Sequence, residues 1–166
     1  MKRWLKICLF CTSTLVLISW DRATKELAKE HLKDKAAVSY LHDFVRLQYA
    51  ENTGAALNLG DSFSKTASFW LLSLLPLVVL LIVFMYVLKK SNEISFLKMF
   101  SFALIFGGGL GNIINRIVFD RHVTDFMIIG FKSIRTGIFN FADVFVTVGA
   151  FALILVYRNK KMIHVV

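Results

Sequence analysis

The chain has 166 residues, of which 57% are hydrophobic and 16 are Phe, and its mean hydropathy is +0.63. A soluble domain rarely has this composition, and the length leaves little room for a second domain. The net charge of +9 does not favour nucleic-acid binding, because the basic residues cluster at the ends of apolar segments. We therefore predict one integral membrane domain over residues 1–166, with the anionic membrane surface facing its basic residues.

The first apolar stretch, residues 4–20, reaches the roughly 17 residues that a short membrane-spanning helix needs. A cleaved signal peptide is the alternative, since a basic N-terminus precedes the apolar core. No small-residue cleavage site follows that core, so we expect a retained helix. Cys8 and Cys11 lie within it among aliphatic residues, where buried, inert thiols are a better interpretation than a redox or metal pair.

The pattern changes after the first apolar stretch. Residues 22–33 carry alternating charges on a helical pattern and predict an amphipathic helix at the membrane surface. Between residues 38 and 59 the pattern changes to short alternating runs such as residues 44–49, which are typical of strands. We expect a small β-rich element outside the membrane.

Three further apolar stretches complete the predicted bundle, at residues 69–88, 96–114 and 139–157. The second of these contains Lys98 and four glycines; glycine in membrane helices often allows close helix contact. The run Gly107–Gly111 follows no strand, so helix packing explains it better than a nucleotide site does. The predicted fold is an all-α membrane protein with four transmembrane helices, a small extracytoplasmic β-rich element and an amphipathic surface helix.

The distribution of basic residues predicts the orientation. One side of the predicted bundle has short flanks rich in lysine and arginine, namely Lys2, Arg3, Lys6, Lys89, Lys90, Lys98, Arg158, Lys160 and Lys161. The basic residues of the other side are spread over two longer segments, and short flanks count most in the positive-inside rule. Both termini are therefore expected in the cytoplasm, with the long segments, residues 21–68 and 115–138, on the outer side.

Asp143 is the most informative residue, because a carboxylate inside an apolar helix costs roughly 2.5 to 3.5 kcal/mol on insertion scales. It requires a partner or a water-filled cleft. The alternative is a carboxylate just above the membrane that caps the helix start, although Asn140 is the better cap.

Asp125 is a second acidic residue in a locally apolar run, expected near the outer end of the third helix. Two neighbouring carboxylates would share one proton near neutral pH, which suits peptide hydrolysis. Spacing alone does not establish this pairing with Asp143. Serine and metal catalysis have less support, because no Gly-x-Ser-x-Gly or His-Glu-x-x-His pattern occurs.

Five short motifs occur in one order along the chain: Asp21-x-x-x-Lys25, Asn52-Thr53-Gly54-Ala55-Ala56, Gly111-Asn112-x-x-x-Arg116, Val123-x-Asp125-Phe126 and Phe139-Asn140-x-Ala142-Asp143. Together they resemble the type II, or lipoprotein, signal peptidases over essentially the whole chain. The resemblance implies a bacterial cytoplasmic-membrane aspartic endopeptidase that works without metal or cofactor. Its substrates would be prolipoproteins, cut just before a diacylglyceryl-modified cysteine near the outer face.

The same resemblance implies the site residues. Asp125 and Asp143 would be the catalytic pair, supported at the substrate cleft by Asn52, Gly54, Asn112, Arg116, Asn140 and Ala142. Asp21 and Lys25 match a motif that can equally be structural, because an i,i+4 ion pair can anchor a helix end. The alternative for Arg116 is an arginine that snorkels to the membrane surface. A monomer is expected.

Two positions depart from the family pattern, Asn115 in place of the common Asp and Leu57 in place of the usual Phe. We expect Asn115 to alter local hydrogen bonding without abolishing cleavage, because amide and carboxylate are nearly isosteric. Two other classes of function stay open: a lipopeptide-binding protein without catalysis, and a carrier of protons or small polar solutes. The carrier would need further acidic or histidine steps across the membrane.

Overall fold

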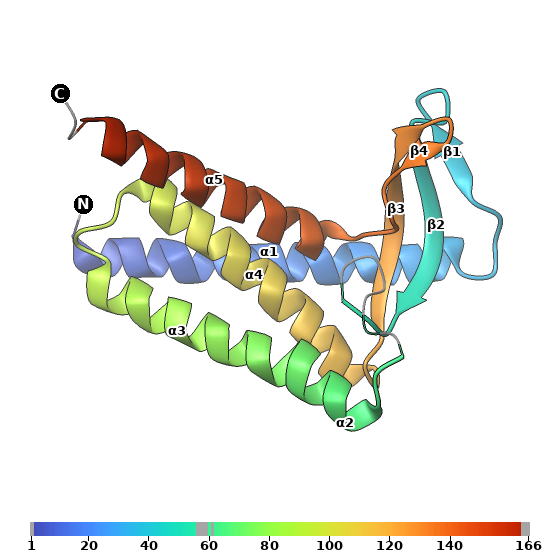
Figure 1. The fold of residues 1–166 in the computed structure, drawn as a ribbon, viewed down its shortest axis with the longest axis horizontal. Coiled ribbons are helices and arrows are strands. Elements are labelled where there is room, and N and C mark those ends of the chain that lie inside the picture. Colours follow the sequence, from blue (N-terminus) through green and yellow to red (C-terminus); the bar gives the residue numbers. More distant parts are fainter. Residues whose placement is uncertain (1, 56–59, 61, 164–166) are drawn as a thin grey trace.

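In the computed structural model, which describes residues 2–55, 60 and 62–163, long helices form a bundle and a small sheet covers one end (Figure 1). The helices are α1 (Arg3–Leu32), α2 (Lys65–Ser68), the π-helical turn η2 (Phe69–Leu74), α3 (Leu75–Lys90), α4 (Phe96–Val118) and α5 (Phe141–Ile163). Within these described residues, four helical segments are long and apolar enough to cross a membrane, with α2, η2 and α3 counting as one. The predicted four-span bundle is confirmed.

Helix α1 runs without a break for 30 residues, about 45 Å at the usual rise. The segment 22–33 is helical as predicted, but it continues the first membrane helix and does not form a separate surface element. The helix passes Asp21 because the charge of this residue is neutralised one turn later by Lys25, whose Nζ lies 2.7 Å from Oδ2 of Asp21. Both side chains are buried. The charged residues that end the apolar stretch in the sequence therefore form an ion pair inside the protein.

The second span contains a wider turn before its only proline. Pro76 lacks a backbone N–H and removes one hydrogen bond from the preceding turn. Residues Phe69–Leu74 form the π-helical turn η2 there, and the N–H of Leu75 donates to the carbonyl of Trp70. Helix α3 then continues regularly to Lys90.

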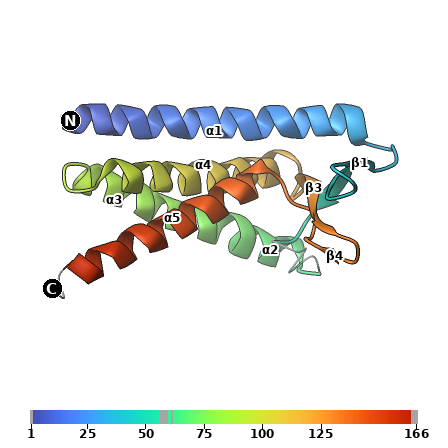
Figure 2. The same ribbon diagram turned by 90° about the horizontal axis from the view of Figure 1, so that it is seen from above.

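Helix α4 is the centre of the bundle and lies between α1 on one side and α3 and α5 on the other (Figure 2). Its glycines allow this position. A Cβ atom at Gly107 would lie 3.0 Å from Leu17 of α1, and one at Gly109 would lie 2.9 Å from Leu80 of α3. At Gly108 it would collide with the backbone carbonyl of Ala142 in α5. The predicted packing role of the glycine run is confirmed.

The sheet has four antiparallel strands in the order β1 (Val38–Tyr40), β2 (Val45–Asn52), β3 (Val123–Phe131) and β4 (Ile134–Arg135). The first two were predicted. The third was not, because Val123–Phe131 is too continuously apolar to show strict alternation. Asp125 therefore lies on a strand, opposite Ala50 of β2, and it lines one cleft with Asn112 and Arg116 from the outer end of the third membrane helix, α4.

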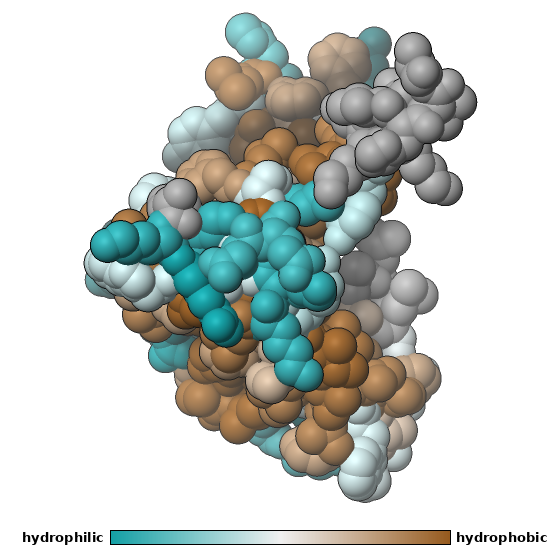
Figure 3. Space-filling model, turned by 90° about the vertical axis from the view of Figure 1, so that its left-hand side faces the viewer, coloured by the Kyte–Doolittle hydropathy of each residue, from teal (hydrophilic) through white to brown (hydrophobic). Residues whose placement is uncertain are grey.

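The start of α1 and the end of α5 lie at the end of the bundle opposite the sheet (Figure 1). Hydrophilic side chains gather at this end and apolar surface surrounds them (Figure 3). Lys2, Arg3, Lys89 and Lys90 are exposed there. Cys8 is exposed on α1 and Cys11 is half-buried, so the expected burial of both thiols is wrong for Cys8.

Candidate active site

The site forms where three helices and two strands meet beneath the sheet. The backbone N–H of Ala142, at the start of α5, donates to Oδ1 of Asp21 in α1 at 2.9 Å. A Cβ atom at Gly111 of α4 would lie 2.7 Å from the other oxygen of Asp21. Asp21 therefore joins the start of α5 to the middle of α1 at the point where α4 has no side chain.

Asn140 and Asp143 cap the start of α5 reciprocally. The side-chain oxygen of Asn140 accepts from the N–H of Asp143 at 3.1 Å, and Oδ2 of Asp143 accepts from the N–H of Asn140 at 3.1 Å. This is a capping box, which satisfies two backbone donors at the helix start. Asn140 is the cap, as the sequence indicated, and Asp143 also contributes to the capping. Its second oxygen, Oδ1, is left to accept from the amide of Asn112 at 2.8 Å.

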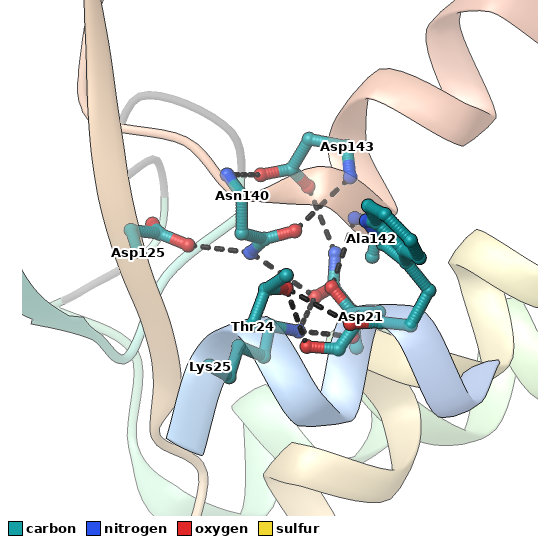
Figure 4. A network of polar contacts seen from close by, with 9 residues as sticks. Asp21, Thr24, Lys25, Asp125, Asn140, Ala142 and Asp143 are labelled. Carbon is teal, nitrogen blue, oxygen red and sulfur yellow. Dashed lines mark hydrogen bonds and ion pairs between the residues drawn. The ribbon is translucent and has the colours of Figure 1, made fainter. Parts of the chain in front are cut away.

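Asp125 is only 3% exposed, and both its oxygens accept hydrogen bonds. Asn140 donates to Oδ1 at 2.6 Å and Asn52, at the end of β2, donates to Oδ2 at 2.9 Å. Burial raises the pKa of Asp125 to about 6, with the charge of Asp143 acting in the same direction and the two amides opposing it. Asn140 lies between the two aspartates and contacts both (Figure 4).

A buried lysine orients the amide that faces Asp143. Lys25 donates to Oδ1 of Asn112 at 2.8 Å as well as to Asp21. An ammonium group can only donate, so this contact fixes the Asn112 oxygen toward Lys25 and its NH₂ group toward Asp143. Lys25 thus acts on the site through Asn112, and the first motif of the sequence is both a structural anchor and a support of the site.

A cleft of about 380 Å³ opens beside the two aspartates. Arg116 of α4 lines it and donates to the carbonyl of Gly54 at 2.7 Å, which holds the turn after β2 against the helix. Within the described part of the chain, the Nε–H of Arg116 meets no acceptor although it is buried. Arg116 therefore lies in the cleft, where its guanidinium also contacts the turn after β2.

The remaining predicted residues lie close by. Gly54 is buried and its N–H donates to Oδ1 of Asn52 at 2.8 Å. Ala142 is fully buried, so it contributes its backbone N–H to Asp21 and no side-chain surface to the cleft. Asn115 is buried behind the site, where it lines a second polar cleft of about 70 Å³ together with Lys25. Leu57 lies outside the described residues.

No three side chains of His, Cys, Asp or Glu among the described residues are grouped so that they could hold a metal ion. The site offers two carboxylates for chemistry, and that of Asp125 is deeply buried. Each of their four oxygens already accepts a hydrogen bond.

Comparison with known proteins gives the family. A family model described as signal peptidase (SPase) II matches residues 13–158. The chain belongs to the signal peptidase II family. It is similar to the lipoprotein signal peptidase of Chlorobium phaeobacteroides, at 35% identity over 90% of this chain and 90% of that protein. The lipoprotein signal peptidase of Borrelia duttonii is 30% identical over 84% of each chain.

Two solved structures share the fold of this family member. Both are bacterial membrane enzymes, whose structures were solved by the in meso method at 2.3 Å and 1.9 Å resolution. The first has a TM-score of 0.79 and 22% identity, with 93% of this chain and 90% of the other covered. The second has a TM-score of 0.73 and 23% identity, with 91% and 93% covered. The chain is accordingly a multi-pass bacterial membrane peptidase.

The apolar wall of the cleft was not predicted from the sequence. Val144, Thr147 and Val148 line it along one face of α5, and residues 136–139 line it before that helix begins. The signal was available, since 144, 147 and 148 share a helix face at spacings of three and four residues. In a span that is apolar all round, however, this face does not stand out from the others.

Proposed function

We propose that this chain is an aspartic endopeptidase that removes signal peptides from prolipoproteins by cutting just before the diacylglyceryl-modified cysteine. The observation that carries the proposal is the bridge of Asn140 between Asp125 and Asp143 at the edge of the cleft. The names of the curated relatives, lipoprotein signal peptidases, support the choice of substrate.

The surroundings of the two aspartates suggest which one holds the shared proton. Asp125 is only 3% exposed and its pKa is raised to about 6, so it holds a proton up to a higher pH than an ordinary aspartate does. Asp143 lies in the first turn of α5, and its two oxygens accept from the amide of Asn112 and from the backbone N–H of Asn140. We assign Asp143 as the general base and Asp125 as the general acid.

Hydrolysis then follows in two proton-balanced steps. Asp143 takes a proton from water as the water oxygen attacks the scissile carbonyl carbon, while Asp125 donates its proton to the carbonyl oxygen. The result is a tetrahedral diol. When the C–N bond breaks, Asp143 passes its proton to the leaving nitrogen and one diol hydroxyl returns a proton to Asp125. Both carboxyl groups end in the state in which they began.

The cleft offers separate polar and apolar contacts to such a substrate. Arg116 lines the cleft, and its guanidinium can donate to a peptide carbonyl near the dyad. Thr147 and Val148 are exposed on α5, so this wall of the cleft suits an apolar signal segment or a lipid tail. The substrate lipid would supply affinity and the two aspartates the chemistry, without metal and in a monomer.

The proposed orientation places both termini in the cytoplasm and the dyad near the outer face. The ion pair of Asp21 and Lys25 lies at the level of the dyad, and Trp20, the residue before it, is 55% exposed. Tryptophan is typical of the membrane interface. Eleven further helical residues, or about 16 Å, follow Asp21 to the end of α1, which supports a dyad close to the membrane surface.

The experiment uses the full chain in lipid nanodiscs with a diacylglyceryl-modified precursor and, as control, the same precursor without the lipid. We expect one cleavage, located by mass spectrometry immediately before the modified cysteine, and little cleavage of the unmodified precursor. Cleavage elsewhere would refute the proposed cut site. Tight binding of the lipidated precursor with no cleavage at all would favour a binding protein in place of an enzyme.

A further inference from the structure

The end of the sheet farthest from the dyad carries a group of exposed apolar side chains on two turns. Leu41 and Phe44 belong to the β1–β2 turn, and Phe131 and Ile134 flank the β3–β4 turn. Ile134 is 83% exposed, Leu41 72% and Phe131 59%. We call these four residues the apolar tip. The contacts of the cleft described above do not involve any of them.

The two turns of the apolar tip are joined to each other. The N–H of Gly130 donates to the carbonyl of Phe44 at 2.9 Å. Arg135 donates to the carbonyl of Asp43 at 3.1 Å and also to its carboxylate, which accepts from Arg46 as well. The hydrogen bonds from Arg46 hold the pKa of Asp43 well below its usual range, so this ion pair persists over the physiological pH range.

The backbone of the apolar tip is held in an uncommon shape. Leu41, His42, Asp43 and Lys132 all have positive φ angles, between 52° and 68°. Residues with a side chain rarely adopt this region, and such conformations persist where surrounding contacts fix them. The guanidinium groups around Asp43 supply those contacts, so the apolar side chains are presented by a fixed scaffold and not by a loose loop.

The surroundings of the apolar tip are basic. One carboxylate, that of Asp43, faces the guanidinium groups of Arg46 and Arg135, and exposed Lys132 adds a further positive charge. Exposed aliphatic and aromatic side chains flanked by Lys and Arg are typical of surfaces that enter the headgroup region of an anionic membrane. Charge complementarity therefore favours anionic phospholipid as the occupant.

The position of the apolar tip is also consistent with a phospholipid membrane as its binding partner. The strands lie across the end of the bundle, and both turns project past the start of α5 (Figure 1). A stable protein interface needs roughly 20 to 30 residues a side, and four side chains on two turns fall far short of that. We propose that the apolar tip inserts into the outer leaflet beside α5, with the exposed ammonium group of Lys132 on anionic headgroups, and so sets the height of the sheet above the bilayer.

The test measures depth, and it is independent of catalysis. A nitroxide label is attached to Ile134→Cys in a chain that also carries Cys8→Ser and Cys11→Ser. Reference labels are placed at Ile82→Cys, exposed on the membrane helix α3, and at Lys35→Cys, exposed after the end of α1. The full protein is placed in phosphatidylcholine vesicles with and without phosphatidylglycerol, and collisions with oxygen and with a water-soluble nickel complex are compared.

We expect the oxygen-to-nickel collision ratio at position 134 to exceed that at position 35 several-fold and to approach that at position 82. Phosphatidylglycerol should raise the ratio further, and Lys132→Glu should remove this increase. A ratio at position 134 equal to that at position 35 in both kinds of vesicle would overturn the proposal. Label immobilisation that grows with protein concentration would also overturn it, because a second copy would then cover the apolar tip.

Discussion

Asn140 contacts both aspartates and makes different hydrogen bonds with each of them. Its NH₂ group donates to buried Asp125, whereas its oxygen and its backbone N–H complete the helix cap with Asp143. One residue thereby fixes the relative position of a strand carboxylate and a helix carboxylate. Precise mutual positioning is what general acid–base catalysis requires, because proton transfer depends on hydrogen-bond distance.

The pH dependence of cleavage tests the assignment of Asp125 as the acid. Because its pKa is raised to about 6, kcat/KM should fall by about tenfold per pH unit above that value. Asn52 donates to the ionised carboxylate and lowers the pKa, so Asn52→Ala should raise the pKa and move the alkaline limb to higher pH. Asn92→Ala, at the opposite end of the bundle, is the control. A limb that moves to lower pH would contradict the assignment.

The buried ion pair should matter more for stability than an exposed one. Asp21→Asn leaves the ammonium of Lys25 buried without its counter-charge, which should cost about 3 to 5 kcal/mol of unfolding free energy. Asp120→Asn removes a partner of Lys65 from a pair whose side chains are about 70% exposed. Thermal unfolding in detergent should show a large fall in midpoint for the first change and almost none for the second; equal effects would contradict this role for the pair.

At the scale of the helices, the glycine run controls how closely α5 approaches α4. Gly108→Ala would place a methyl group against the backbone carbonyl of Ala142, beside Asp143. Displacing the dyad by about 1 Å can lower the rate on the order of 10²-fold. Gly109→Ala is the matched control, because the three heavy atoms nearest to its methyl group all belong to the flexible side chain of Leu80. Comparable kcat values for the two variants would show that the close α4–α5 contact does not position the dyad.

The spans could be predicted from the sequence because each is a long apolar run, which the bilayer requires of any helix that crosses it. The end of the first helix could not. A charged residue at position 21 marks the end of an apolar run, yet Lys25 one turn later neutralises its charge, and the N–H of Ala142, which is 121 positions away, donates to its carboxylate. Strand β3 was missed because residues 126–131 form a nearly continuous apolar run without the strict alternation that indicates a strand.

The candidate site was predicted only in part, and mainly from the family resemblance. Composition alone identifies Asp143 as unusual, because its burial must be compensated. The link between Asn140 and Asp125 spans 15 positions and that between Lys25 and Asn112 spans 87, so no local pattern encodes either contact. The resemblance selected these residues, and the fold supplies the physical connection between them.

For the whole molecule, the orientation in the membrane can be tested directly. In a chain with Cys8→Ser and Cys11→Ser, single cysteines replace Lys35, beyond the sheet end of α1, and Asn92, in the α3–α4 turn. Because the basic flanks favour a cytoplasmic position for that turn, a membrane-impermeant maleimide should label position 35 in intact spheroplasts and position 92 only after lysis. The reverse pattern would place the dyad on the cytoplasmic side.

The central claim is that Asp125 and Asp143 act together as the catalytic pair, and single-turnover cleavage of a lipidated precursor measures it most directly. Asp125→Asn and Asp143→Asn should each slow the chemical step by at least about 10²-fold while the precursor still binds. Glu51→Gln, a similar change on the neighbouring strand outside the cleft, should leave the rate nearly unchanged. Cleavage by either aspartate variant at the rate of the parent chain would contradict the account.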